Sequence, residues 1–236
     1  MHKACLHLIP FPLTGAPISQ MSQEAIEAAK LLDCFLAERT KTARHFIKAL
    51  GHPLPQSAIE VVEIGEKDLV NNFNWLLEKI NSGHSVGVVS EAGMPCIADP
   101  GTELVKFAHK HGIKVVPHAG PNSMMMALMS SGFSGQQYQF HGYLPAKKEL
   151  LRESLIKLGQ TALNSPISHI FMETPYRNKQ MFQIAFSVLP QSLDLCIATG
   201  LGSSDEIIKT MNVKLWKTEN LDAYIDKPSI FILSKA

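Results

Sequence analysis

The sequence predicts an α/β fold whose N-terminal half holds a mostly parallel sheet, and three observations support this prediction. Short apolar segments alternate with amphipathic helical segments over the first half of the chain. This β–α–β–α order is typical of parallel strands joined by right-handed crossovers. Several of these strands end in turns rich in glycine, proline and other small residues, which is where open α/β sheets bind their ligands.

The N-terminal half is expected to contain five strands with helices between them. The strands are predicted at residues 4–9, 34–37, 58–64, 86–89 and 114–117. The first helix is expected to be capped by Ser22 or Ser19, since serine is a favoured N-cap residue. Further helices are predicted at residues 42–50, 69–80 and 103–110. Each helix has its apolar residues on one face, as a helix that covers a sheet requires.

The stretch 85–101, SVGVVSEAGMPCIADPG, is the centre of this arrangement. Its apolar start predicts a buried strand, and ELVKFAHKHG after it predicts a helix. The connection between them is about twice the usual two to six residues. Two prolines restrict its shape, and small residues allow a close approach of the backbone to a ligand. We expect a ligand-binding loop here.

Beyond the turn at residues 118–123 the alternation becomes looser, and we place a domain boundary there. The prediction is an N-terminal α/β domain at residues 1–118 and a C-terminal mixed-sheet α+β domain at residues 119–236. A methionine-rich helix up to Ser131 and helices at 147–159 and 176–188 are expected in the second domain. Its strands are predicted at residues 138–143, 168–173, 193–199, 206–211, 213–216 and 229–234.

Composition limits the function classes. Lys and Arg number 22 and Asp and Glu 21, so the formal net charge is +1. A protein that relies on non-specific affinity for nucleic acid is usually far more basic, so any such role needs a local patch. Four separated cysteines in apolar contexts are expected to be buried free thiols. His109 and His111 point apart on their helix, and no metal site is expected. Neither a signal peptide nor a membrane-spanning run is evident, which favours the cytoplasm.

Five segments carry a resemblance to the tetrapyrrole-methylase superfamily, and within it to the bacterial small-subunit rRNA (cytidine-2′-O)-methyltransferase branch. That branch has S-D-A-G-x-P-x-I-S-D-P-G, P-G-P-S-A, A-L-x-x-S-G, G-F-L-P-x-K and E-S-P-x-R in this order. The matching segments here are residues 90–101, 119–123, 127–132, 142–147 and 173–177. The resemblance covers nearly the whole chain.

The resemblance implies two α/β domains with S-adenosylmethionine in the cleft between them. One wall would be the loop 90–97, and Asn122, Ser123, Met172 and Leu201 would lie opposite it. For each residue alone, plain packing is an alternative. The cofactor-binding residues implied are Ser90, Glu91, Ala92, Gly93, Met94, Pro95, Ile97, Asn122, Ser123, Met172 and Leu201.

A ribose hydroxyl that accepts a methyl group must lose its proton. The candidates for this chemistry in matched positions are Glu38, Lys147, Glu173 and Arg177, although Glu173 and Arg177 could instead pair with each other across a helix start. A basic patch for RNA phosphates could include Lys41, Arg44, His45, Lys147, Lys148 and Arg152, or these residues could simply be solvated. The expected partner is small-subunit rRNA, and the expected assembly is a homodimer.

The sequence departs from the branch mainly on the substrate side. The A-E-D-T-R motif becomes Ala37-Glu38-Arg39-Thr40-Lys41, and R-E-L-T-K-x-x-E becomes residues 199–206, TGLGSSDE. The motif G-N-L-x-D-I-T is absent after the first strand. Two alternatives therefore stay open: a methyltransferase of the same fold acting on a tetrapyrrole or another small molecule, and a cofactor-binding relative without catalysis.

Overall fold

The computed structural model describes residues 3–65 and 68–235. The chain divides into two compact units, Met1–Asn122 and Ser123–Ala236, and each is described by itself. The boundary expected between residues 118 and 119 lies shortly before this division. Whether the two parts are independent domains stays a prediction.

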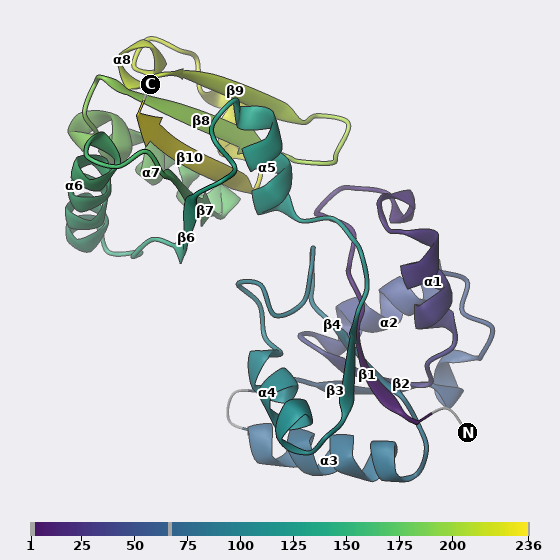
Figure 1. The fold of residues 1–236 in the computed structure, drawn as a ribbon. Coiled ribbons are helices and arrows are strands. Elements are labelled where there is room, and N and C mark those ends of the chain that lie inside the picture. Colours follow the sequence, from purple (N-terminus) through teal and green to yellow (C-terminus); the bar gives the residue numbers. More distant parts are fainter. Residues whose placement is uncertain (1–2, 66–67, 236) are drawn as a thin grey trace. The chain divides into compact units, whose positions relative to one another are not determined.

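The first unit contains a five-stranded sheet in which all neighbouring strands are parallel (Figure 1). Its strand order is β3-β2-β4-β1-β5. The strands are β1 (Cys5–Leu8), β2 (Cys34–Ala37), β3 (Glu60–Glu63), β4 (Val86–Val89) and β5 (Lys114–Pro117). The helices are η1 (Ile18–Gln20), α1 (Gln23–Lys30), α2 (Thr40–Ala49), η2 (Gln56–Ala58), α3 (Leu69–Asn81) and α4 (Thr102–Lys110).

Helices cover both faces of this sheet, as its apolar strands require. Alternate residues of β2 point to opposite faces, so Phe35 packs in the cluster of α1 and α2, whereas Leu36 packs in the cluster of α3 and α4. Gly87 of β4 faces Phe35, and a Cβ atom there would lie 2.8 Å from the Phe35 ring. The core therefore has three layers, and the turns after the strands gather at one edge.

The second unit contains a mixed five-stranded sheet of order β6-β7-β10-β8-β9. Strands β6 and β7 are parallel, and the other neighbours are antiparallel. The strands are β6 (Tyr138–Tyr143), β7 (Ser168–Glu173), β8 (Leu193–Thr199), β9 (Ile207–Asn212) and β10 (Ser229–Lys235). The helices are α5 (Ser123–Ser131), α6 (Lys148–Leu163), α7 (Pro175–Val188), α8 (Val213–Trp216) and α9 (Asp222–Ile225).

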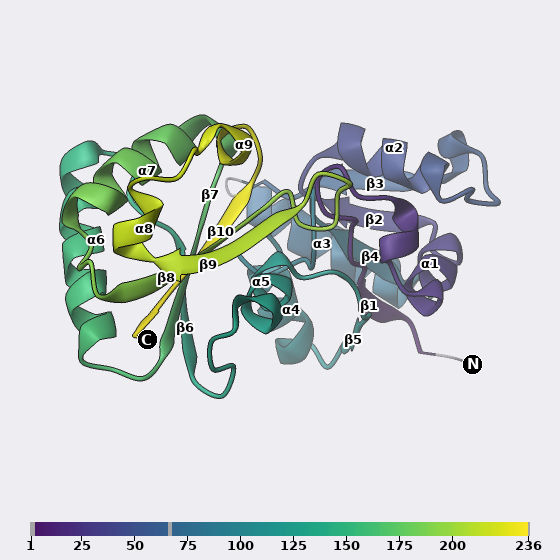
Figure 2. The same cartoon turned by 90° about the horizontal axis from the view of Figure 1, so that it is seen from above.

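Helices α6 and α7 cover one face of the second sheet and α5 lies against the other, as Figures 1 and 2 both show. The main core lies under α6 and α7, where the rings of Phe171 and Phe231 stack with 5.1 Å between their centroids. Trp216 and Tyr224 close the same core from α8 and α9. The predicted α/β class, with a parallel first sheet and a mixed second sheet, is confirmed.

The strand predicted at residues 213–216 is wrong, because these residues form α8. The Oδ1 atom of Asn212 accepts a hydrogen bond from the backbone N–H of Lys214 at 3.1 Å and starts the helical turn. The turn buries Trp216, whose Nε1 donates to the carbonyl of Leu195 at 2.8 Å. The short helix α9 was not predicted.

All four cysteines are free thiols, as expected, but only two of them are buried. Cys34 and Cys196 lie within the sheets, whereas Cys5 and Cys96 are partly exposed. The expectation that Cys5 and Cys96 are buried is wrong. Cys5 is the first residue of β1 and Cys96 lies in the loop after β4, so neither lies inside a sheet. Within the described residues, no helix has the length and apolar character needed to cross a membrane.

Candidate functional site

Three turns meet at the carboxyl edge of the first sheet, where β1, β4 and β5 end. Backbone hydrogen bonds join Phe11, after β1, to Gly93, after β4, at 2.7 and 3.0 Å. The hydroxyl of Ser22 donates to the carbonyl of Ala119, after β5, at 2.9 Å. Gly120 packs so closely on Pro10 that a Cβ atom would lie 2.2 Å from the proline Cβ. The three turns thus form one continuous edge.

The loop after β4 has an unusual backbone. Cys96 and Ala98 adopt φ angles of 70° and 60°, and they are the only residues besides glycine with positive φ in the described chain. This left-handed conformation costs free energy for residues with a Cβ atom. Gly101 has φ 124° and lies against Cys96, where a Cβ atom would be 2.8 Å from Sγ. The loop therefore keeps a shape that local propensity does not favour, a feature frequently found at ligand sites.

Two carboxylates from neighbouring strands meet in this loop. Glu38 follows β2, and its Oε2 accepts a hydrogen bond from the backbone N–H of Glu91 at 3.0 Å. The Oε1 atom of Glu91 accepts from the hydroxyl of Thr42 on α2 at 2.7 Å, and its Oε2 lies 3.4 Å from Nε of Arg39. The loop is thereby tied to the start of α2.

A third carboxylate, Asp99, lies near the other two. Its partial burial and the negative charge of Glu38 raise the pKa of Asp99 to about 7, and Glu91 adds to this effect. A carboxyl group with such a pKa exchanges a proton near neutral pH. The sequence analysis assigned no role to Asp99. The signal that could have found it is a second acidic residue, besides Glu91, in the loop expected to bind a ligand.

The predicted residue Asn122 lies at the same edge, since its Nδ2 contacts Sδ of Met94 at 3.7 Å. The other cofactor-side residues of this unit all belong to the loop, in which Ser90, Gly93 and Pro95 are buried. Ile97 exposes 41% of its surface. The predicted residues of the first unit are therefore brought together.

In the second unit, Met172 and Leu201 lie at one edge of the mixed sheet. Met172 is the penultimate residue of β7 and pairs with Ile230, which in turn pairs with Ala198 of β8. Leu201 follows β8 by two residues and is buried. Ser123 begins α5. The structure places Met172 and Leu201 at the ends of two strands that both pair with β10, at the same edge of the sheet.

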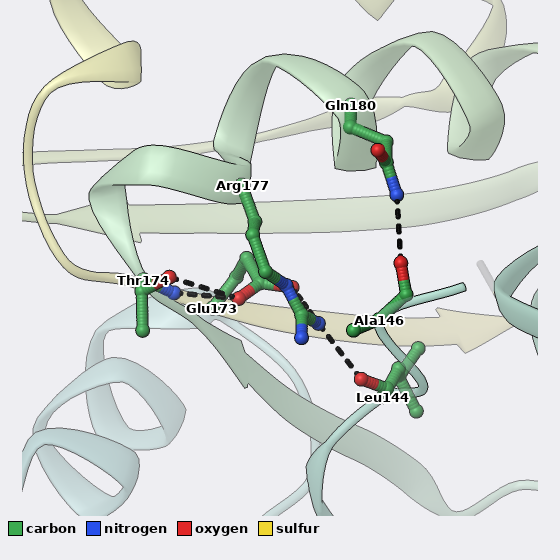
Figure 3. Close-up of polar contacts among 6 residues, drawn as sticks. All are labelled: Leu144, Ala146, Glu173, Thr174, Arg177 and Gln180. Atoms are coloured by element: carbon green, nitrogen blue, oxygen red, sulfur yellow. Dashed lines mark hydrogen bonds and ion pairs between the residues drawn. The ribbon is translucent and has the colours of Figure 1, made fainter. Parts of the chain in front are cut away.

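Glu173 and Arg177 form an ion pair at the start of α7, so this alternative from the sequence is confirmed (Figure 3). Nε of Arg177 donates to Oε2 of Glu173 at 2.8 Å, and the backbone N–H of Thr174 donates to Oε1 at 2.7 Å. Arg177 also donates to the carbonyl of Leu144 at 2.8 Å. The Glu173 side chain is completely buried.

The segment 144–147, which follows β6, is held by α7 at two points. Arg177 binds the carbonyl of Leu144, and Nε2 of Gln180 donates to the carbonyl of Ala146 at 3.1 Å (Figure 3). Lys147 follows immediately as the N-cap residue of α6 and is exposed. The contribution of Gln180 was missed because it depends on where the strand end lies in the fold. The catalytic roles of Lys147, Glu173 and Arg177 stay predictions.

The family model of the tetrapyrrole (corrin/porphyrin) methylases matches residues 14–214. The chain belongs to this family. The predicted membership is confirmed, and tetrapyrrole methylases use S-adenosylmethionine as methyl donor. The matched range covers most of both units and includes every residue that the sequence predicted for the site.

Curated tetrapyrrole methylases similar to this chain include two named ribosomal RNA small subunit methyltransferase I. The one from Vibrio cholerae is 29% identical over 206 residues, or 87% of this chain and 68% of the relative. The one from Halalkalibacterium halodurans is 33% identical over 177 residues, or 75% of this chain and 57% of the relative. The chain thus spans roughly six- to seven-tenths of these relatives.

Among solved structures of the fold, the methyltransferase CobJ has a TM-score of 0.63 at 12% identity. The likeness covers 99% of this chain and 95% of CobJ. At this identity the likeness shows the fold alone, and it extends over both units.

A group of potential metal ligands lies away from this edge. In the described part of the chain, Asp33, Cys34 and His84 have ligand atoms within 4.8 Å of one another. Nδ1 of His84 lies 2.9 Å from Oδ2 of Asp33. Hydrogen bonding to His84 lowers the pKa of Asp33 despite its partial burial, and burial raises the pKa of Cys34 to about 12. A hydrogen bond between Asp33 and His84 beside a protonated thiol accounts for the group.

Proposed function

We propose that this chain transfers a methyl group from S-adenosylmethionine to the 2′-hydroxyl of a ribose in RNA, a cytidine of small-subunit rRNA. The observation that supports RNA as the methyl acceptor is a basic groove beside the loop that follows β4. The names of the two bacterial relatives support the same substrate. The fold itself does not discriminate, because it serves many substrates.

The groove has a volume of about 620 Å³ and is lined by α2 and the segment before β3. Its lining residues are Lys41, Thr42, Arg44, His45, Lys48 and Gln56. Lys41, His45 and Lys48 are exposed, while Nη1 of Arg44 donates to the carbonyls of Gln56 and Ile59 at 3.1 and 3.4 Å. In a chain of net charge +1, this local concentration of cations suits a polyanion.

Thr42 of α2 connects the groove to the loop. Thr42 lines the groove, and its hydroxyl donates to Glu91 of the loop at 2.7 Å. RNA phosphates held along α2 would therefore lie next to the loop that the family resemblance assigns to the cofactor. This proximity supports RNA as the methyl acceptor.

The chemistry of the loop fits the cofactor. S-adenosylmethionine carries positive charge on its sulfonium and its ammonium group, and Glu38, Glu91 and Asp99 supply negative charge or oxygen acceptors at this edge. The short apolar side chains of Ala92 and Ile97 suit its uncharged parts. We therefore assign the loop residues 90–95 and 97, with Asn122, to the cofactor, and we assign Ser123, Met172 and Leu201 of the second unit to the same ligand.

The bound cofactor supplies an electrophilic methyl group, so the protein mainly has to position the acceptor and deal with its proton. Glu38 is our candidate for the proton acceptor, because its Oε1 accepts no hydrogen bond from the described residues while Oε2 is fixed by Glu91. Lys147 is our candidate for stabilising the negative charge that develops on the ribose oxygen. Glu173 and Arg177 act as positioning residues that hold the segment carrying Lys147.

The test is transfer of labelled methyl from S-adenosylmethionine into fractionated cell extract, with nuclease-treated extract as the control. We expect label in ribosomal RNA that disappears after nuclease treatment. Label that survives nuclease would refute the RNA acceptor and favour the tetrapyrrole or other small-molecule alternative. Binding of S-adenosylhomocysteine without any labelled product would favour a relative that has lost catalysis.

An rRNA substrate implies an enzyme that works in the cytoplasm, where ribosomes are assembled. We also propose a homodimer. Light scattering coupled to gel filtration measures its mass directly, and a mass of one chain at assay concentration would refute the dimer.

A further inference from the structure

Tyr176 is presented to solvent on a rigid part of the second unit. It lies in the first turn of α7 and exposes 96% of its surface, the largest exposed fraction among the large apolar side chains of the described residues. Its neighbours on both sides are fixed, because the Thr174 backbone and the Arg177 side chain both bind the buried carboxylate of Glu173. An aromatic side chain at a fixed position is usually packed against other side chains, because its burial stabilises the fold.

Two exposed lysines lie on the helices joined near Tyr176, one on α7 and one at the start of α6. Lys179 lies one helical turn from Tyr176, and residues at this spacing share a face of the helix. Gln180, four residues after Tyr176, donates to the carbonyl of Ala146 at 3.1 Å, and Lys148 follows Ala146 by two residues as the first residue of α6. Lys148 and Lys179 are exposed, and neither forms an ion pair with another described residue. Glu149 is the neighbouring acidic group, so the surface keeps a net positive charge.

We propose that Tyr176, Lys148 and Lys179 form a platform for single-stranded RNA, with one unstacked base on the tyrosine ring and the adjacent phosphates on the two lysines. The inference rests on the proposed RNA substrate and adds a binding site to it. The motif E-S-P-x-R leaves the position of Tyr176 open, so the resemblance assigns this residue no role.

Two physical arguments favour single-stranded RNA over other partners. Stacking on an aromatic side chain requires a base that is not already stacked in a duplex. Lysine is depleted in protein–protein interfaces, whereas unpaired lysines beside an aromatic ring are what a single-stranded nucleic acid uses. The segment that carries Lys148 is also held by Arg177 and Gln180, so the platform exists before RNA binds.

The test compares wild type, Tyr176→Ala, Tyr176→Phe and a matched control, Tyr138→Ala, which changes a tyrosine exposed by 43% at the other end of β6. Anisotropy of a fluorescein-labelled oligocytidine gives the dissociation constant. We expect Tyr176→Ala to weaken binding by about 10-fold, as loss of one stacked base does, and Tyr176→Phe and Tyr138→Ala to bind like wild type. Equal affinity of Tyr176→Ala and wild type would overturn the platform.

A second readout separates this inference from the proposed function. Methylation of small ribosomal subunits is followed as kcat and KM for the same variants. The platform predicts a raised KM for Tyr176→Ala with kcat unchanged. RNA methylation that is insensitive to Tyr176→Ala would overturn the platform and leave the proposed function standing. Oligocytidine binding that depends on Tyr176, without methylation of RNA, would overturn the proposed function and leave the platform standing.

Discussion

The carboxylate of Glu38 accepts a hydrogen bond from the backbone N–H of Glu91, with 3.0 Å between Oε2 and N. This bond joins the ends of β2 and β4 and fixes the first turn of the loop assigned to the cofactor. We expect Glu38→Ala to weaken binding of S-adenosylhomocysteine by about 10-fold, since a hydrogen bond to a charged group contributes about 1.5–3 kcal/mol. Glu38→Gln keeps an acceptor and should bind nearly like wild type. Isothermal titration calorimetry measures both.

Glu63→Ala is the matched control for Glu38. The Oε2 atom of Glu63 also accepts a hydrogen bond from a backbone N–H, that of Thr40 at 3.2 Å, but Glu63 is the last residue of β3 and lies outside the loop. Its replacement should leave cofactor affinity unchanged. Wild-type affinity in Glu38→Ala would refute the role given to this hydrogen bond.

The raised pKa of Asp99 predicts a pH-dependent stability. Between the ordinary pKa of 3.8 and the folded value of about 7, the folded state binds more protons than the unfolded state, so Asp99 lowers stability as pH rises through this range. Asp99→Asn removes this effect, so the free energy of unfolding of the variant relative to that of wild type should be higher at pH 8 than at pH 5. One pKa unit corresponds to about 1.4 kcal/mol, and we expect this difference between the two pH values to be about 2 kcal/mol.

Urea unfolding at the two pH values measures this difference for Asp99→Asn and wild type. Asp226→Asn, which changes an exposed carboxylate after α9, is the control and should show no such difference. A change in stability from Asp99→Asn that is equal at both pH values would contradict the account of Asp99.

Loss of the Arg177–Glu173 ion pair is expected to lower the free energy of unfolding strongly. Arg177→Met leaves a completely buried carboxylate without its cation and should destabilise the protein by about 3 kcal/mol. The double variant Glu173→Gln/Arg177→Met removes the buried charge as well and should recover part of the loss. Gln180→Ala, which loses only the bond to Ala146, should cost about 1 kcal/mol or less. A double variant as unstable as Arg177→Met would contradict this explanation.

The sequence predicts this pair but not the environment of Asp99, and the reason is the range of the interaction. Glu173 ends β7 and Arg177 lies in the first turn of α7, so their separation of only four residues keeps them close together. The pKa of Asp99 depends on Glu38, which belongs to another strand and reaches Asp99 only through the strand order of the sheet. Strands and helices with clear apolar periodicity were predictable for the same local reason.

The error at α8 has a comparable cause. The alternation in Val213–Trp216 resembles a strand, but the Asn212 cap and the hydrogen bond from Trp216 to Leu195 favour a helical turn. The contact to Leu195 is between residues that are distant in the sequence. Local pattern alone could not reveal it.

The basic groove predicts a salt-dependent affinity for RNA. Lys41→Ala and Lys48→Ala should each weaken binding of small-subunit rRNA and reduce the slope of log affinity against log salt by about 0.7–0.9, because each removes one phosphate contact. Lys110→Ala, an exposed lysine of α4 on the other face of the sheet, is the control. Filter binding over a range of salt concentrations measures the slopes. Unchanged slopes in both groove variants would exclude this groove from RNA binding.

Methyl transfer to a ribose hydroxyl can be measured on the small ribosomal subunit itself. Small ribosomal subunits that lack the modification are incubated with the protein and labelled S-adenosylmethionine, and their RNA is digested to nucleosides and separated by mass spectrometry. The account predicts that the label appears as 2′-O-methylcytidine. Label on a base, on another nucleoside, or outside RNA would contradict it.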